Sequence, residues 1–78
     1  MIAETTSDQF VDAGPYSIEH VPTGVVFSTF PYLNPQELTD PMVRGSNDTD
    51  TRGVVYSPLD MATVALALLR KKLLSRVA

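Results

Sequence analysis

The chain has 78 residues, with nine acidic and six basic side chains and a formal net charge of −3. It contains no cysteine and one histidine, His20, so its own ligands can build neither a disulfide nor a tetrahedral zinc or iron–sulfur site. A core of this size supplies roughly 3 to 5 kcal/mol of stability, and with disulfides and metals excluded we expect association with other chains to add to it.

The charges are unevenly distributed along the chain. Residues 1–60 hold all nine acids and two arginines, a net of −7, whereas residues 61–78 hold four basic residues and no acid. An acidic body disfavours a polyanionic partner, but the basic end can contact phosphate or an acidic protein surface. Residues 1–8 lack the basic and apolar regions of a secretion signal, and the longest uncharged apolar run, 61–69, is too short to cross a bilayer. These features leave the localisation open, and they favour an intracellular position, or one within a virion or complex, over secretion.

The first residues, 1–15, are mainly polar and end in Gly14 and Pro15. A segment of this composition buries too little apolar surface to offset the conformational entropy that ordering it would cost. We expect an extended N-terminal arm that is flexible or becomes ordered by contact with a partner.

Residues 16–57 are predicted to form an extended body with short strands. Apolar and polar side chains alternate over 16–21, and β-branched and aromatic residues are concentrated over 24–30, as in two strands of a sheet. Pro22 and Gly24 lie between them and favour a turn. A short β-hairpin is the expected structure.

The rest of this body is expected to be rich in loops. Asn34 and Pro35 are typical of a helix start and predict about one helical turn, which Pro41 ends. Residues 45–53 have the small polar composition of a loop, and residues 53–56 are a candidate third strand.

Residues 58–78 are predicted to form one α-helix, over about 58–77. Ser57 supplies an N-cap, Pro58 the first helical position, and Asp60 a negative charge that the helix dipole favours. Apolar side chains occur on both sides of this helix: one broad face carries Leu59, Ala62, Leu66, Leu69, Leu73 and Val77, and the other carries Met61, Val64 and Leu68. The expected fold is thus small α+β or irregular, with more apolar helix surface than the rest of the chain can cover.

These features favour a non-catalytic structural or accessory subunit of a larger protein assembly, such as a minor virion or phage component or a small subunit of a large complex. Self-association is also open. The expected partner contacts are the apolar helix positions and the aromatic residues of the body: Leu59, Met61, Val64, Leu66, Leu68, Leu69, Leu73, Phe27, Phe30 and Tyr32. The alternative is a peripheral adaptor that binds an anionic membrane surface or nucleic acid through Arg70, Lys71, Lys72 and Arg76.

The sequence indicates no catalytic, cofactor or metal site. His20 has no nucleophile at a spacing that builds a catalytic arrangement, so a structural histidine is the preferred interpretation. Asp48 and Asp50 match the start of a calcium loop, but Arg52 replaces its third oxygen ligand and Leu59 stands where its bidentate glutamate would be. We expect neither an enzyme nor a bound cofactor.

Overall fold

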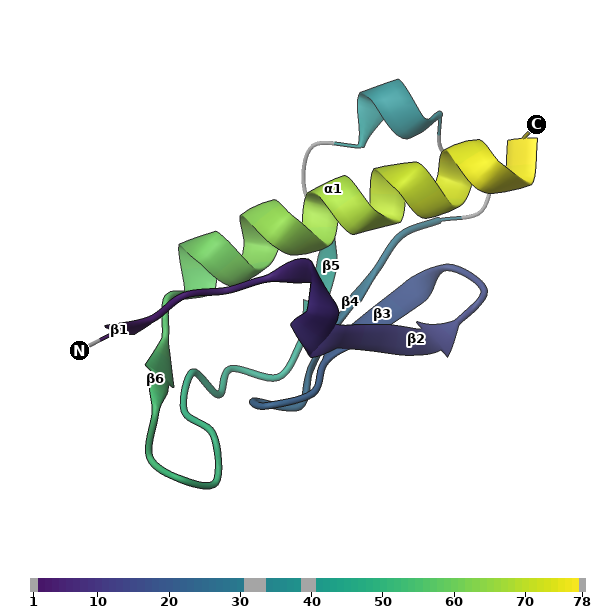
Figure 1. Ribbon diagram of the computed structural model, residues 1–78. Coiled ribbons are helices and arrows are strands. Elements are labelled where there is room, and N and C mark those ends of the chain that lie inside the picture. Colours follow the sequence, from purple (N-terminus) through teal and green to yellow (C-terminus); the bar gives the residue numbers. More distant parts are fainter. Residues whose placement is uncertain (1, 31–33, 39–40, 78) are drawn as a thin grey trace.

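The computed structural model describes residues 2–30, 34–38 and 41–77, and these form a small α+β fold in two layers. Its sheet has four antiparallel strands in the order β2 (Phe10–Gly14), β3 (Ser17–His20), β4 (Val25–Ser28) and β5 (Met42–Arg44). A separate parallel pair joins β1 (Ile2–Ala3) to β6 (Val55–Tyr56). One long helix, α1 (Pro58–Val77), lies across a single face of the sheet, and two 3-10 turns, η1 (Ser7–Gln9) and η2 (Pro35–Glu37), complete the fold (Figure 1).

Strands β3 and β4 form the hairpin that the alternating sequence predicts. Ile18 pairs with Phe27 and His20 with Val25, and the backbone N–H of Gly24 donates to the carbonyl of His20 at 2.7 Å. Gly24 has φ +76°, in the left-handed region where a residue without Cβ is unstrained. The predicted hairpin is confirmed.

Two further strands flank the hairpin at positions that the sequence pattern does not mark. Strand β2 lies in the stretch that we expected to be an arm, and it pairs with β3 through Phe10 opposite His20 and Val11 opposite Glu19. Strand β5 pairs with β4 on the other side, with Val43 opposite Phe27. Both are short edge strands whose register comes from pairing with the hairpin, which is why local composition does not reveal them.

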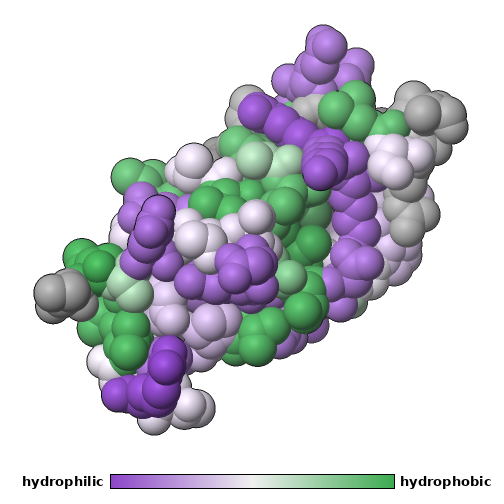
Figure 2. Space-filling view, in the orientation of Figure 1, coloured by the Kyte–Doolittle hydropathy of each residue, from purple (hydrophilic) through white to green (hydrophobic). Residues whose placement is uncertain are grey.

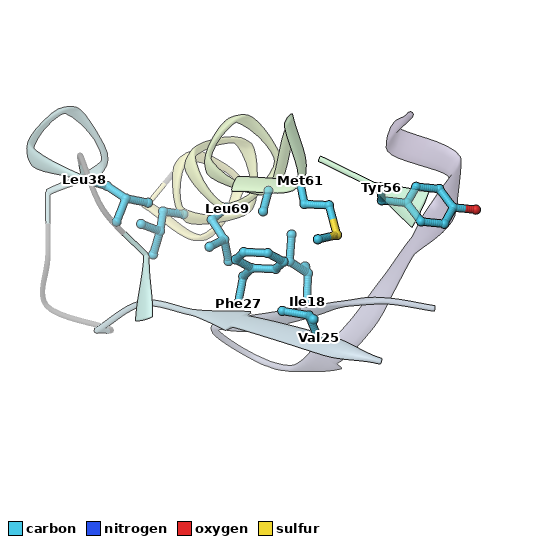
Figure 3. Close-up of a cluster of buried hydrophobic side chains, with 9 residues drawn as sticks. Ile18, Val25, Phe27, Leu38, Tyr56, Met61 and Leu69 are labelled. Atoms are coloured by element: carbon cyan, nitrogen blue, oxygen red, sulfur yellow. The ribbon is translucent and has the colours of Figure 1, made fainter. Parts of the chain in front are cut away.

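Helix α1 begins and ends where the sequence predicts. The hydroxyl of Ser57 accepts the backbone N–H of Asp60 at 3.3 Å, which is the expected N-cap. Its buried side chains follow every four residues, and they pack with residues from β3, β4, β6 and the residue after η2 into one core (Figure 3). The core consists of Ile18, Val25, Phe27, Leu38, Tyr56, Met61, Ala65, Leu69 and Leu73.

The predicted helical turn after the hairpin is η2. The side-chain oxygen of Asn34 accepts the backbone N–H of Gln36 at 3.0 Å, as a helix-starting asparagine does. Leu38, directly after η2, is buried in the core, and this anchors the turn against α1.

Candidate binding groove

An open groove of about 310 Å³ lies between the C-terminal half of α1 and the edge strand β2. Ile18, Phe10 and Leu68 contribute apolar surface to it, and lysine and serine side chains lie at its sides. Figure 2 shows hydrophobic surface across the middle of this view, bordered by hydrophilic residues. The lining residues are Ser7, Phe10, Val11, Asp12, Ile18, Leu68, Lys71, Lys72 and Ser75. This volume is at the lower end of the range for ligand pockets, and it suits one or two side chains of a partner.

Lys72 fastens the helix to the turn between β2 and β3 at one side of the groove. Its ammonium group donates to the carboxylate of Asp12 at 2.7 Å and to the carbonyls of Gly14 and Ser17 at 2.8 and 3.1 Å. All three ammonium protons can therefore be satisfied within the chain. Lys72 is therefore a structural residue that joins the two elements on either side of the groove, α1 and β2.

The other basic candidates differ in what they contact. Arg70 donates through Nε and Nη2 to the carbonyl of Leu38, at 3.1 and 2.7 Å, and so ties α1 to η2. Lys71 is exposed and lines the groove. The side chain of Arg76 lies outside the described residues. Among the described basic side chains at this end of α1, Arg70 and Lys72 therefore bind acceptors of the chain itself. The sequence pattern did not reveal these contacts.

The ten expected partner contacts divide by burial. Four of them, Phe27, Met61, Leu69 and Leu73, are buried in the chain's own core and are not accessible to a partner in this structure. Val64, Leu66 and Leu68 are half-buried, Phe30 and Leu59 are exposed, and Tyr32 lies outside the described residues. The sheet offers one apolar face to α1, so it covers one side of the helix and leaves part of the other open.

Several exposed apolar residues were not among the expected contacts. They lie mostly on strands and near turns: Ile2, Val11, Val21, Met42, Val43, Val55 and Leu74. Val11 matters most because it lines the groove and its side chain is accessible. No local signal would have found it, because β2 does not alternate: Val11, Asp12 and Ala13 are all exposed, and the strand is defined by its pairing with β3.

His20 is fully buried, at 0% exposure, and both of its ring nitrogens have partners. Nε2 lies 2.8 Å from Oε1 of Gln9, and Nδ1 lies 2.8 Å from the hydroxyl of Thr23. The amide nitrogen of Gln9 donates to the carbonyl of Glu4 at 3.0 Å, so Oε1 is an acceptor and the proton of the neutral ring is assigned to Nε2. His20 is therefore a buried side chain whose two ring nitrogens are both occupied by partners within the chain.

Asp50 organises the loop before β6. Its carboxylate accepts the backbone N–H groups of Arg52 and Val54 at 2.8 and 3.0 Å, and it pairs with the guanidinium of Arg52 at 3.0 Å. Burial by itself raises the pKa of Asp50, but the hydrogen bonds from Val54 and Arg52 outweigh it and hold the pKa below its usual range. This carboxylate has a structural role as the organiser of a turn.

Within the described residues, no three His, Cys, Asp or Glu side chains come together in a way that would hold a metal ion. The same part of the chain contains no helix whose length and apolar character would suit a membrane span. No protein-family model, no curated protein and no solved structure matches this chain.

Proposed function

We propose that this chain is a non-catalytic structural or accessory subunit of a larger protein assembly, and that it docks through the groove between α1 and β2. The observation that carries the proposal is the open groove itself, which leaves the exposed side chain of Val11 and the half-buried side chains of Phe10 and Leu68 along its lining. Contact between these apolar side chains and water is unfavourable, so a partner that covers them would gain free energy from their burial.

The groove also indicates the chemistry of the partner. Apolar side chains fit between α1 and β2, and exposed Lys71 lies at the side of the groove, where an acidic side chain can pair with it. Lys72 is already satisfied by Asp12 and two carbonyls, so it adds little attraction for a second anion. The partner that fits is a protein segment with apolar residues flanked by an acid.

The contacts of the described basic residues favour a protein partner over the anionic membrane or nucleic acid. Arg70 and Lys72 bind atoms of the chain itself, so a polyanion at this end meets fewer available charges than the sequence suggests. The burial of His20 with both nitrogens bonded supports a non-catalytic role.

The test uses the full chain, tagged and expressed in its source cells. Extracts separated by size under native conditions should contain the tagged chain in a complex far larger than a 78-residue monomer. Replacing Val11 with aspartate places a charge in the groove and should release the chain to the monomer position.

The matched control is Val21→Asp. Val21 is 52% exposed and Val11 is 50% exposed, but Val21 follows β3 and lies outside the groove. This variant should remain in the complex. A wild-type chain that migrates as a monomer, or an equal effect of both substitutions, contradicts the proposal. Complexes that fall apart when nucleic acid or lipid is removed would favour the adaptor function instead.

A further inference from the structure

The histidine at the end of β3 joins four separate parts of the fold. Its ring packs against Phe10 of β2 and Tyr56 of β6, with ring centroids 4.9 Å away in both cases. Gln9, the last residue of η1, binds Nε2, and Thr23 of the hairpin turn binds Nδ1. The Thr23 hydroxyl also lies 3.6 Å from the sulfur of Met61 in α1. The N-terminal segment is therefore held to the sheet through the side chain of His20 in addition to the backbone pairing of β2 with β3.

The surroundings of the ring suit a neutral imidazole. Among the described residues it contacts an amide, a hydroxyl and two aromatic rings, and Tyr56 is the titratable side chain among them. The carboxylate of Asp50 lies 3.4 Å from the hydroxyl of Tyr56. Glu4 is linked to Gln9 through its backbone carbonyl, which accepts the side-chain N–H of Gln9. A second proton on Nδ1 would point at the Thr23 hydroxyl, which would then have to donate to the weakly accepting sulfur of Met61.

Protonation would thus place a charge in a buried site without a carboxylate in contact with the ring. Burial lowers the pKa of His20 below its ordinary value, because the charged form loses its hydration. When the segment around Gln9 moves away and water enters, the ring recovers its ordinary affinity for a proton. Acid therefore favours the opened arrangement.

We infer that His20 is an acid-sensitive latch, which holds η1 and the start of β2 against the sheet while it is neutral and releases them when it is protonated. Ser7 and Phe10 line the groove and belong to the released segment. If the groove is the docking site proposed above, acid would also displace the residues of η1 and β2 that line it. This consequence rests on the proposed function, whereas the latch does not.

The backbone N–H of Val21 reports the opening directly, because it donates to the carbonyl of Gln9 at 3.0 Å. Thr29 supplies the internal reference, since its N–H donates to the carbonyl of Tyr16 at 3.0 Å, directly beyond the open end of the β3–β4 hairpin. Hydrogen exchange of the isolated full chain, followed by NMR between pH 7.5 and 5.0, gives a protection factor for each amide after correction for intrinsic exchange.

The protection factor of Val21 should be constant above pH 6.5. Below pH 6.5 it should fall by up to about tenfold per pH unit, because opening is then linked to the uptake of one proton. Protection of Thr29 should stay unchanged over the same range. An unchanged Val21 amide overturns the latch, and so does an equal loss at both amides, which would mean that the whole chain unfolds.

The variant His20→Gln keeps a side-chain amide that can donate toward Gln9 but cannot take up a proton. Its Val21 protection should not depend on pH, and the same pH dependence as in the wild type would assign the effect to another group.

The nitrogen-15 spectrum of the wild-type imidazole gives a second measurement that needs no variant. It should show the proton on Nε2 at pH 7.5, and the ring should take up its second proton only at a lower pH than the onset of the loss of Val21 protection, because most chains are still closed at that onset; a ring that becomes protonated while Val21 stays fully protected overturns the latch. Neither measurement involves a partner, so a failed docking experiment leaves this test intact.

Discussion

Replacing Lys72 with methionine should destabilise the chain, because it removes the charged contacts that join α1 to the turn between β2 and β3. The ion pair with Asp12 contributes at most about 1 kcal/mol, since the Asp12 side chain is 83% exposed. The two bonds to the carbonyls of Gly14 and Ser17 come from a side chain that is 16% exposed, and hydrogen bonds from charged donors contribute about 1.5–3 kcal/mol each when both ends stay dry. Water can reach these turn carbonyls after the substitution, so we expect a total loss of about 2 kcal/mol.

The assay is urea denaturation followed by circular dichroism, with Lys71→Met as the matched control. Lys71 is exposed and loses the same charge, but no hydrogen bond or ion pair joins it to another described residue, so its variant should stay within about 0.5 kcal/mol of the wild type. A loss of 2 kcal/mol corresponds to a melting temperature lower by about 8–16 °C for a chain of this size. Equal midpoints for the two variants would refute the role of the ammonium as a clamp.

Two more substitutions test the core and the hairpin turn. Leu69→Ala should cost about 2–5 kcal/mol and leave much of the chain unfolded, because Leu69 is 0% exposed, whereas Leu74→Ala on the exposed side of α1 should change the denaturation midpoint little. Gly24→Ala should cost about 1–2 kcal/mol through backbone strain, since φ is +76° and no atom lies within 4 Å of an added Cβ. Gly24→Asn should cost less in the same melting experiment, because asparagine tolerates this conformation, and an equal cost would mean that strain is not the cause.

The local elements of this protein follow from short sequence signals. Helix α1 runs from Pro58 to Val77, as the cap at Ser57 and the following apolar run indicate. The β3–β4 hairpin follows from alternation around the turn at Gly24. These signals are readable because helix caps, turns and paired strands depend on residues close together in the chain.

The candidate groove was much less predictable. Its walls come from the consecutive elements η1, β2 and β3 on one side and from α1, about 50 residues further along the chain, on the other. Leu68 was expected to be a contact residue, and it does line the groove, whereas Val11 was not expected at all. Leu69, one position after Leu68, turned out to be a core residue, because the sheet covers that side of the helix and not the next.

The basic end of α1 was also only partly predictable from the sequence. The sequence placed positive charge there and left open whether it binds a partner, and the structure shows Arg70 and Lys72 bound to carbonyls 32 and at least 55 residues away in the chain. No local pattern encodes such contacts, since they arise only when the sheet brings the two turns to the helix.

The sequence by itself determined the small size, the lack of disulfides, the hairpin and the one capped helix, because each depends on composition or on neighbouring residues. Only the tertiary structure decided which face of α1 is buried, that Phe10–Gly14 is an edge strand, and that His20 is sealed between four elements. The physical reason is that burial and strand pairing are set by contacts between distant segments, and these contacts select among faces and registers that are locally equivalent.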